Sequence, residues 1–399
     1  MYIFKTNIDA KTHDDFVKQS PLCNLLQSSN WAKIKDNWDS CITGVYQKDK
    51  LVASGLILIK HLPLSFTMMY IPRGPIMDYE NKELVKFYLK ELKKWAKTKH
   101  CLFISFDPAI KLREFDLDHK DKPDDQKALS IINNLQDNKA IYKGKTLKIE
   151  ETIQPRFHMG LYYTDDLNSH LPKSTIKSCK AAIKRHVNVK VADHSEVEKF
   201  AKMIELTEKH KNVHLRNEEY FRKILDVYKE DATLYLADVN VNTYKKELED
   251  SIQIANDTLQ NEKATNNAKN KALQTIKNSE KELLAINDLA NKYPSDETII
   301  AGGLMVGFGN TCEMLYAGRN DDFNSFRPQY YLYTKKIEHS FKQGYQYVNM
   351  GGIEGTLDDG LSKFKANFNP VIIEYVGEFD LPVMPLLYKL AKFAQKNLK

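Results

Sequence analysis

The sequence predicts a mixed α/β protein, of the α+β kind, with two domains and an inserted helical arm. Its 399 residues exceed the roughly 250–300 that one hydrophobic core supports, so two cores are expected. Strand-like and helix-like runs alternate without the regular βαβ repeat of a doubly wound sheet. We therefore expect a first domain at 1–152, a second domain at 153–241 and 293–399, and a helical insert at 242–292.

The first domain is expected to contain a β-hairpin followed by alternating strands and helices. Apolar residues 42–46 and 51–59 flank the polar residues 47–50, which is the pattern of two antiparallel strands joined by a turn. The next elements are predicted to be a strand at 67–71, a helix at 81–98 and a strand at 101–106.

The second domain is predicted to repeat this mixture of elements. Apolar residues 232–239 and 298–308 are suited to pair as an antiparallel hairpin, although the insert separates them. The other predicted elements are helices at 173–186, 196–210, 218–229 and 329–344, and strands at 312–316 and 347–350.

The insert is expected to form two antiparallel helices with a coiled-coil seam. It contains neither glycine nor proline, and its apolar residues recur at spacings of three and four. Each helix would have about 20 residues and be about 30 Å long. The apolar positions are Tyr244, Leu248, Ile252, Ala255 and Leu259 in the first helix, and Leu273, Ile276, Leu283, Ile286 and Ala290 in the second.

Positive charge is concentrated in two segments. The chain has 59 Lys+Arg and 53 Asp+Glu, a formal net charge of +6. Residues 167–192 include six basic residues and no acidic one, and residues 263–277, at the tip of the insert, include four lysines and no acidic residue. Both segments favour contact with a polyanion. The alternatives are a solvated helix face for the first and a solubilising turn for the second.

Several classes of protein are excluded by composition and by missing motifs. A hydrophobic fraction of 42% excludes global disorder. The five dispersed cysteines form no CxxC pair, which argues against a disulfide framework and structural zinc. GxGxxG, GK[ST], GxSxG and HExxH are absent, so nucleotide-loop, hydrolase and metallopeptidase hypotheses have no support. The N-terminus lacks a signal-peptide pattern and the longest apolar run, 51–59, is short, so we expect a cytoplasmic protein.

The first candidate site is a predicted helix at 27–38. Trp31, Lys35 and Trp38 would share one face of it, at positions i, i+4 and i+7. A lysine between two indoles must find an anion or reach water. An anion-binding lysine and a lysine that only extends to solvent are both consistent with this pattern.

Asp107 and Arg216 are candidates because of where they stand relative to predicted elements. Asp107 ends the strand 101–106 and precedes a proline, where a carboxylate can hold an amine or open a turn. Arg216 precedes the predicted helix cap Asn217, where the helix dipole opposes its charge. An anionic ligand would explain it, as would pairing with Glu218 or Glu219.

The last candidate is Lys365, which lies between Phe364 and Phe368 and follows the glycine pair Gly351-Gly352. Glycines allow a close approach of the backbone to a ligand, and a fixed cation can stabilise an oxyanion or a phosphate. The alternative is a glycine turn with an exposed lysine.

Together these segments resemble the FemABX family of peptidoglycan bridge-forming aminoacyltransferases, and in particular its MurM/MurN branch. They occur in family order along nearly the whole chain. The segments are LQSSNWAKIK at 26–35, YIPRGPIMD at 70–78, FDP at 106–108, TIQPR at 152–156, YAG at 316–318, GGI at 351–353, FK at 364–365 with Phe368, and GEFDLP at 377–382.

The resemblance implies two GNAT-like (acyl-CoA N-acyltransferase-like) domains with a cleft between them. It also implies transfer of an amino acid, alanine or serine, from aminoacyl-tRNA to an amine of a lipid-linked, lipid II type peptidoglycan precursor. Aminoacyl-tRNA would be a co-substrate, with no further cofactor and no metal. The protein would be cytoplasmic, with peripheral contact at the inner face of the cytoplasmic membrane.

The resemblance also assigns roles to residues. Lys365, next to Phe364, corresponds to the lysine at the acyl-tRNA ester, and Asp107 to the carboxylate near the acceptor peptide. Leu102-Phe103 stands where the family often has a tyrosine, which leaves the acceptor-peptide contacts there undefined. The positions expected to bind the precursor are Lys35, Trp38, Arg216, Tyr220 and Tyr316.

An aminoacyl ester is already activated, so its aminolysis requires orientation of an amine and stabilisation of an oxyanion, but no ATP. Two alternatives remain. A conventional GNAT enzyme that uses acetyl-CoA would carry a Q/R-x-x-G-x-G/A pyrophosphate loop, which is absent from both halves. A non-catalytic tRNA- or membrane-binding module would use the basic segments and the basic, amphipathic C-terminal residues 386–399.

Overall fold

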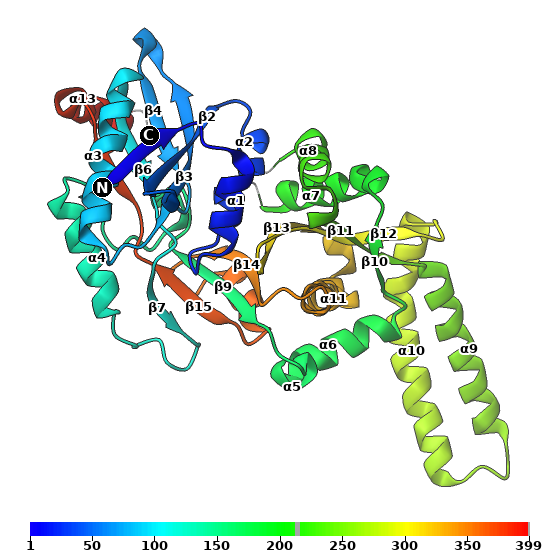
Figure 1. The fold of residues 1–399 in the computed structure, drawn as a ribbon. Coiled ribbons are helices and arrows are strands. Elements are labelled where there is room, and N and C mark those ends of the chain that lie inside the picture. The colour runs from blue at the N-terminus through cyan, green and yellow to red at the C-terminus, as the bar shows by residue number, and fades with distance from the viewer. Residues whose placement is uncertain (212–215, 398–399) are drawn as a thin grey trace.

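A computed structural model describes residues 1–211 and 216–397 as two eight-stranded mixed sheets with helices packed on their faces (Figure 1). The first sheet has the strand order β1-β2-β3-β4-β6-β16-β8, with β5 paired to β3. The second has the order β10-β11-β12-β13-β14-β9-β15-β7. Within the described residues, no helix combines the length and the apolar character needed to cross a bilayer.

The first sheet is built mainly from the N-terminal part of the chain, and the predicted hairpin of β2 and β3 is confirmed. Helix α3 begins where the Asn81 side chain accepts a hydrogen bond from Leu84 N, and its apolar stripe is buried against the sheet. The elements are β1 (Tyr2–Thr6), α1 (Ala10–Lys18), α2 (Ser29–Ile34), β2 (Asp39–Gln47), β3 (Lys50–His61), β4 (Thr67–Ile71), β5 (Ile76–Met77), α3 (Lys82–Thr98), β6 (Cys101–Phe106), α4 (Gln126–Asp137), β8 (Ile141–Tyr142) and β16 (Phe379–Pro382).

The second sheet lies between two layers of helices. The predicted pairing of β11 with β12 is confirmed, with Leu234 opposite Leu304. The elements are β7 (Lys111–Phe115), β9 (Phe157–Tyr162), α5 (Leu167–His170), α6 (Lys173–Lys184), β10 (Asn188–Ala192), α7 (Val197–Lys211), α8 (Glu218–Tyr228), β11 (Ala232–Val239), β12 (Thr298–Phe308), β13 (Thr311–Arg319), α11 (Pro328–Lys342), β14 (Tyr347–Ile353), α12 (Gly360–Ala366) and β15 (Val371–Tyr375). The C-terminal helix α13 (Pro385–Asn397) returns to the first sheet, where it packs against β6.

The two sheets exchange strands, which the expected division at residue 152 does not include. β7, from the first part of the chain, pairs with β15 in the second sheet. β16, from the C-terminal part, lies between β6 and β8 in the first sheet. A third apolar cluster, with Trp31 and Tyr70 from one half and Phe221 and Leu304 from the other, is buried between the halves. Each half therefore depends on the other for part of its core.

Two irregularities in the second sheet affect where the candidate site residues lie. In the parallel pair of β13 and β14, only residues Thr311–Glu313 of β13 pair with residues Tyr347–Asn349 of β14. Beyond these residues β13 continues beside β12, and β14 continues beside β9. A bulge in β13 pairs Met314 with Met305 and Tyr316 with Leu304, which leaves Leu315 unpaired. Because the bulge adds one residue, Glu313 and Tyr316 face the same side of the sheet.

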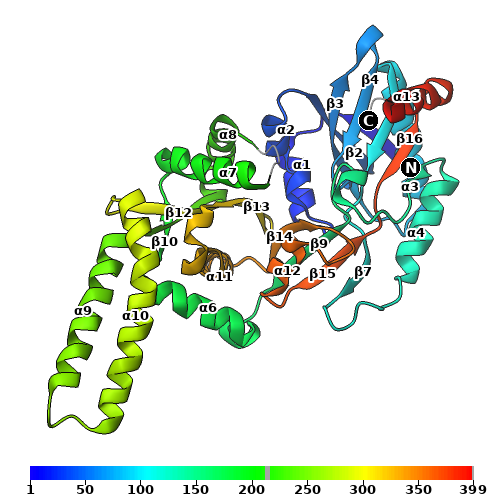
Figure 2. The same cartoon turned by 180° about the vertical axis from the view of Figure 1, so that it is seen from behind.

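The insert forms two helices, α9 (Val241–Gln260) and α10 (Asn266–Lys292), which project as an arm away from both sheets (Figures 1 and 2). Tyr244, Leu248, Ile286 and Ala290 at its base belong to the core of the second sheet. Lysines 263, 271 and 277 at the tip are exposed. In the other basic segment, Arg185 and Lys190 pair with the carboxylates of Glu282 and Glu297, at 2.5 and 2.8 Å.

The helix predicted at 27–38 is much shorter than expected. α2 ends at Ile34, and Lys35 follows it as the C-terminal cap. Trp38 lies beyond the helix, so it does not continue the face formed by Trp31 and Lys35. Its ring instead lies 5.7 Å from Lys60 Nζ on β3.

Candidate active site

Four of the predicted binding residues come together where α2, α8 and β13 meet, and we call them the cationic cluster: Lys35, Arg216, Tyr220 and Tyr316. Lys35 Nζ lies 3.5 Å from Tyr220 Oη and 5.2 Å from the centroid of the Trp31 ring. Arg216 Cζ lies 5.1 Å from the Tyr220 ring, which in turn contacts the Tyr316 ring at 6.1 Å. The bulge in β13 is what directs Tyr316 toward this cluster.

The electrostatics of the cationic cluster suit an anion. Burial, and then the neighbouring Arg216, lower the pKa of Lys35 to about 8. A second cation that lowers the pKa of a buried lysine is unfavourable unless a negative charge joins them. Among the described residues, no ion pair joins Arg216 to Glu218 or Glu219, the alternative partners, and Glu218 instead binds Arg222 at 2.6 Å.

Asp107 is buried between the sheets, with 2% of its surface exposed. Its Oδ1 accepts hydrogen bonds from Tyr70 Oη at 2.8 Å and from Arg73 N at 3.0 Å. Its Oδ2 lies 3.3 Å from Arg73 Nη1. Burial raises the pKa of Asp107 to about 6, and the nearby Arg73 opposes that shift. These contacts make Asp107 an anchor for the loop that carries Arg73.

Arg73 and His158 extend this network from the first sheet to the second. Arg73 Nη2 donates to Pro155 O at 2.6 Å and lies 2.9 Å from His158 Nε2. His158 Nδ1 lies 3.2 Å from Asn349 Oδ1 on β14. Burial lowers the pKa of His158 well below its usual value, and Arg73 adds to that effect, so His158 is neutral and accepts from Arg73.

Glu313, on β13, is partly exposed beside the same network. Burial raises its pKa to about 7, whereas Arg73 and a hydrogen bond with Asn349 oppose the shift. Glu313 and Tyr316 lie on one face of the same strand, so Glu313, beside the buried network, and Tyr316 of the cationic cluster face the same side of the second sheet.

Lys365 lies on the short helix α12, which Asp359 caps by accepting from Leu361 N and Ser362 N at 2.8 and 3.1 Å. Lys365 is 4% exposed, and its Nζ donates to Gly352 O at 2.9 Å. The reading of Lys365 as an exposed lysine is therefore wrong. Gly351, with φ +86°, adopts a backbone conformation that a side chain would strain, close to this ammonium.

Phe364 holds α12 in place and borders a cavity. Its ring packs edge-on against Tyr333 at 5.1 Å and against Phe368 at 5.5 Å. The cavity, of about 480 Å³, lies where β13 and β14 have diverged, and we call it the wedge cavity. It is lined by Thr207, Ala317, Gly318, Arg319, Asp321, Gln329, Tyr333, Asp359, Gly360, Leu361 and Phe364.

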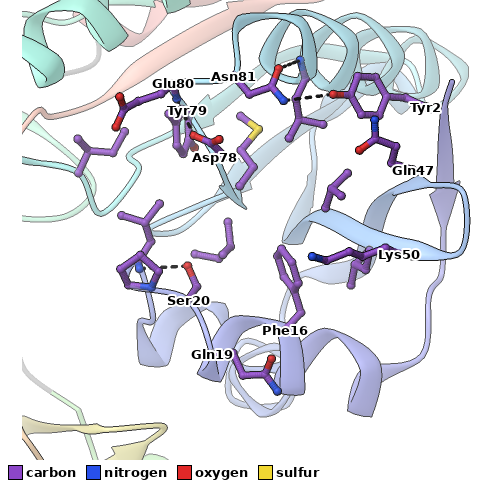
Figure 3. A pocket seen from close by; sticks show the side chains of 18 of the residues that line it. Tyr2, Phe16, Gln19, Ser20, Gln47, Lys50, Asp78, Tyr79, Glu80 and Asn81 are labelled. Carbon is purple, nitrogen blue, oxygen red and sulfur yellow. Dashed lines mark hydrogen bonds between the residues drawn. The ribbon is translucent and has the colours of Figure 1, made fainter.

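A larger cavity, of about 850 Å³, lies within the first half between α1, β3 and the loop before α3 (Figure 3). Phe16, Lys50 and Asp78 are among its lining residues, and Asn81 Nδ2 donates to Tyr2 Oη at its edge. None of the predicted site residues lines this cavity, so we do not assign it to the active site.

The structure thus places Asp107 in the buried network that it forms with Arg73, His158 and Asn349, and Lys365 on α12 against β14. It places four of the precursor-binding candidates in the cationic cluster. Trp38 does not join them. Sequence reasoning missed Arg73, His158, Glu313 and Asn349. Arg73 lies in the quoted YIPRGP segment and could have been found there. Within residues 1–211 and 216–397, no three His, Cys, Asp or Glu side chains are grouped to hold a metal ion.

Known proteins resemble this chain over almost its full length. Residues 8–396 match the FemAB family. The chain is 26% identical to the lipid II:glycine glycyltransferase of Staphylococcus epidermidis, with 99% of this chain and 96% of that protein covered. It is also 26% identical to the aminoacyltransferase FemA of Staphylococcus aureus, with 99% and 98% covered.

Solved structures confirm the expected GNAT-like mixed α/β fold. The crystal structure of FemX superposes with a TM-score of 0.76 and 26% identity, over 98% of this chain and 99% of that one. A tandem GNAT protein from the clavulanic acid biosynthesis pathway shares the fold at a TM-score of 0.50 and 6% identity, over 96% and 99%. Because the sequence match covers nearly the whole chain, the protein belongs to the FemAB family and is an aminoacyltransferase.

Proposed function

We propose that this enzyme transfers an amino acid from aminoacyl-tRNA to an amine on the peptide of a lipid II type peptidoglycan precursor, as a step of interpeptide bridge synthesis. The observation that carries the proposal is the buried Lys365 ammonium, held 2.9 Å from Gly352 O on the helix α12, whose residues Leu361 and Phe364 line the wedge cavity. A fixed cation of this kind stabilises a developing oxyanion without exchanging a proton. Relatives of the chain named for lipid II and for aminoacyl transfer support the acceptor and the reaction class.

In the proposed reaction the neutral acceptor amine attacks the ester carbonyl of the aminoacyl-tRNA. A C–N bond forms, negative charge collects on the carbonyl oxygen near Lys365, and the C–O bond to the ribose then breaks. The proton leaves the amine and reaches the departing ribose oxygen through the tRNA's own hydroxyl or phosphate. The reaction needs no resident metal or cofactor, because the ester supplies the driving force.

The cationic cluster would hold the precursor. Phosphates bind well where arginine and lysine converge with hydroxyl donors, and here Lys35 and Arg216 meet Tyr220 and Tyr316. Binding of a phosphate would also stabilise the charged form of Lys35 and raise its pKa, which at about 8 is low for a lysine. Trp38 is not part of this proposal, since it lies between α2 and β2 and its ring packs beside Lys60 of β3.

The wedge cavity would take the acyl-bearing end of the tRNA. Its volume of about 480 Å³ suits a small ligand group, and Phe364 on its wall precedes Lys365 in α12. Asp107 would orient the acceptor peptide indirectly. Its Oδ1 accepts from Tyr70 Oη and Arg73 N, and its Oδ2 lies 3.3 Å from Arg73 Nη1, so its role would be to fix the loop that carries Arg73.

We further propose alanine or serine as the donated residue, from the resemblance to the MurM/MurN branch, and peripheral attachment of a cytoplasmic enzyme to the inner face of the membrane. The S. epidermidis relative is named for glycine, so glycine is the competing outcome.

The test is an aminoacyl-transfer assay with the purified enzyme, a mixed pool of charged tRNAs and a lipid-linked precursor, read by mass spectrometry of the product. A mass increase of one alanine or serine on the precursor peptide is expected. A glycine adduct would overturn the donor assignment and leave the reaction class intact. Acetylation from acetyl-CoA, or tRNA binding without any transfer, would overturn the proposed reaction.

A further inference from the structure

The C-terminal helix α13 presents an apolar stripe to solvent. Leu386, Leu390 and Phe393 are 80%, 65% and 69% exposed, and their spacing of four and three places them on one side of the helix. The opposite side is fixed to the first sheet, where Tyr388 Oη donates to Asp380 Oδ2 at 3.1 Å and Lys392 Nζ lies 2.9 Å from the same oxygen. The exposed stripe is therefore held in a defined orientation.

A second exposed apolar side chain lies at the same end of the molecule. Leu64, at the turn between β3 and β4, is 87% exposed. Beside this turn, Thr67 N donates to His100 O just before β6 begins, and Val383 N donates to Leu102 O just before α13 begins. The β3–β4 turn and α13 thus lie at the same end of the strands of the first sheet, where β6 begins. Figures 1 and 2 show α13 and the turn at one end, with the helical arm directed to the other.

We call Leu64, Leu386, Leu390 and Phe393 the apolar end face. The charge around it is positive. Lys389 is exposed on α13 beside the stripe, and the sequence from 381 to 399 contains no acidic residue. Lys97 and Lys99, at the end of α3, are also exposed near the β3–β4 turn.

This charge distinguishes between possible occupants of the face. A second copy of the chain would bring two sets of lysines together, and like charges at an interface oppose association. An anionic lipid surface is complementary, because lysines attract its headgroups while apolar side chains enter the acyl boundary. A basic helix with leucine and phenylalanine on its other side is typical of helices that lie in the membrane interface.

We propose that the apolar end face docks the enzyme on an anionic lipid bilayer, with α13 lying in the interface and Leu64 inserting beside it. The inference extends the peripheral attachment of the proposed function and names the surface responsible. Its test measures vesicle binding and not transfer, so the docking surface and the proposed reaction can fail separately.

The test is co-sedimentation of the full-length protein with vesicles of phosphatidylcholine, alone or mixed with phosphatidylglycerol. We expect the wild type to bind the mixed vesicles more tightly, with added salt reducing the difference. The triple variant Leu386→Ser, Leu390→Ser, Phe393→Ser should lower partitioning into the vesicles by at least about 100-fold, and Leu64→Ser should lower it by about tenfold. Each variant removes apolar side chains that would otherwise be buried among the lipid acyl chains. Lys389→Gln should weaken binding to the mixed vesicles alone, by about fivefold.

Leu284→Ser on α10 is the matched control, since Leu284 is 73% exposed on the arm and should not affect binding. Unchanged thermal unfolding midpoints would show that the exposed positions alter no packing. The proposal is overturned if the wild type does not bind the mixed vesicles or if the triple variant binds them like the wild type. It is also overturned if sedimentation velocity shows a dimer that the triple variant dissociates, because the face then joins two copies of the chain.

Discussion

Lys365 is the residue on which the proposed chemistry depends, and its removal should separate turnover from binding. Replacing it by methionine keeps most of the side-chain volume and removes the ammonium that donates to Gly352 O. We expect the rate at saturating substrate to fall by about 100- to 1,000-fold, the usual effect of losing one oxyanion donor, with little change in acceptor affinity. Steady-state kinetics and acceptor binding measured by calorimetry check this.

Lys363→Met is the control for that experiment, because Lys363 is exposed on the same helix α12 and should leave the rate unchanged. Equal losses of rate and of acceptor affinity in Lys365→Met would show that Lys365 only binds the ground state.

Lys336 is a second buried lysine, with no part in the proposed reaction. It is fully buried against Gly303 and the Tyr333 ring, and within residues 1–211 and 216–397 its Nζ has no hydrogen-bond partner. Burial lowers its pKa from 10.5 to about 7. The unfolded chain therefore binds more protons between pH 7 and 10.5, so this group's destabilising effect is full below pH 7 and fades as the pH rises.

Lys336→Met should consequently stabilise the protein, by on the order of 4–5 kcal/mol at neutral pH, since a pKa lowered from 10.5 to about 7 corresponds to about 1.4 kcal/mol for each pKa unit. Denaturant unfolding at several pH values measures this, and the gain should shrink toward pH 10.5. Lys335→Met is the control, because Lys335 pairs with Glu338 and is less buried. A gain that does not vary with pH would show that packing alone, and not the buried charge, is responsible.

At the scale of elements, shortening the helical arm tests whether its basic tip contacts RNA. Residues 250–280 can be replaced by a short Gly-Ser link, because the packed base and the ion pair between Arg185 and Glu282 at 2.5 Å remain. We expect an almost unchanged unfolding midpoint and a tRNA affinity reduced by about tenfold or more, with a shallower dependence on salt, as fewer phosphates are contacted. Filter binding at several salt concentrations measures both.

A full-length variant with the tip lysines 263, 269, 271 and 277 changed to glutamine shows whether tRNA affinity depends on the charge of the tip or on the length of the arm. It should bind tRNA as weakly as the shortened protein does. Unaltered affinity in both variants would identify the tip as a solubilising turn.

At the scale of the whole molecule, the exchanged strands predict that the two halves unfold together. β16 completes the first sheet and β7 extends the second, and a shared apolar cluster lies between them. Calorimetry of the full chain should show one transition, with equal calorimetric and van't Hoff enthalpies. Two resolved transitions would mean that the halves are independent in spite of the exchange.

Some elements of this fold could be predicted from the sequence and others could not. Local patterns located β11 and β12 at their observed bounds, because alternation and burial leave a strong signal in a strand. The helix expected at 27–38 was too long, since tertiary packing ends it at Ile34. The strand exchange left no signal, because short strands pair with whichever edge the fold presents to them.

The sequence by itself determined the mixed α/β class, the paired helices of the insert, and the family, because apolar periodicity and ordered motifs are local properties of a chain. Only the tertiary structure decided which charged groups meet. It brought Arg73 to His158 and Asp107 across the two sheets, and it buried Lys365 beside Gly352. The bulge at Leu315 placed Tyr316 on the same side as Glu313. Such contacts depend on strand register and on sheet pairing between distant segments, which residue spacing along one chain does not specify.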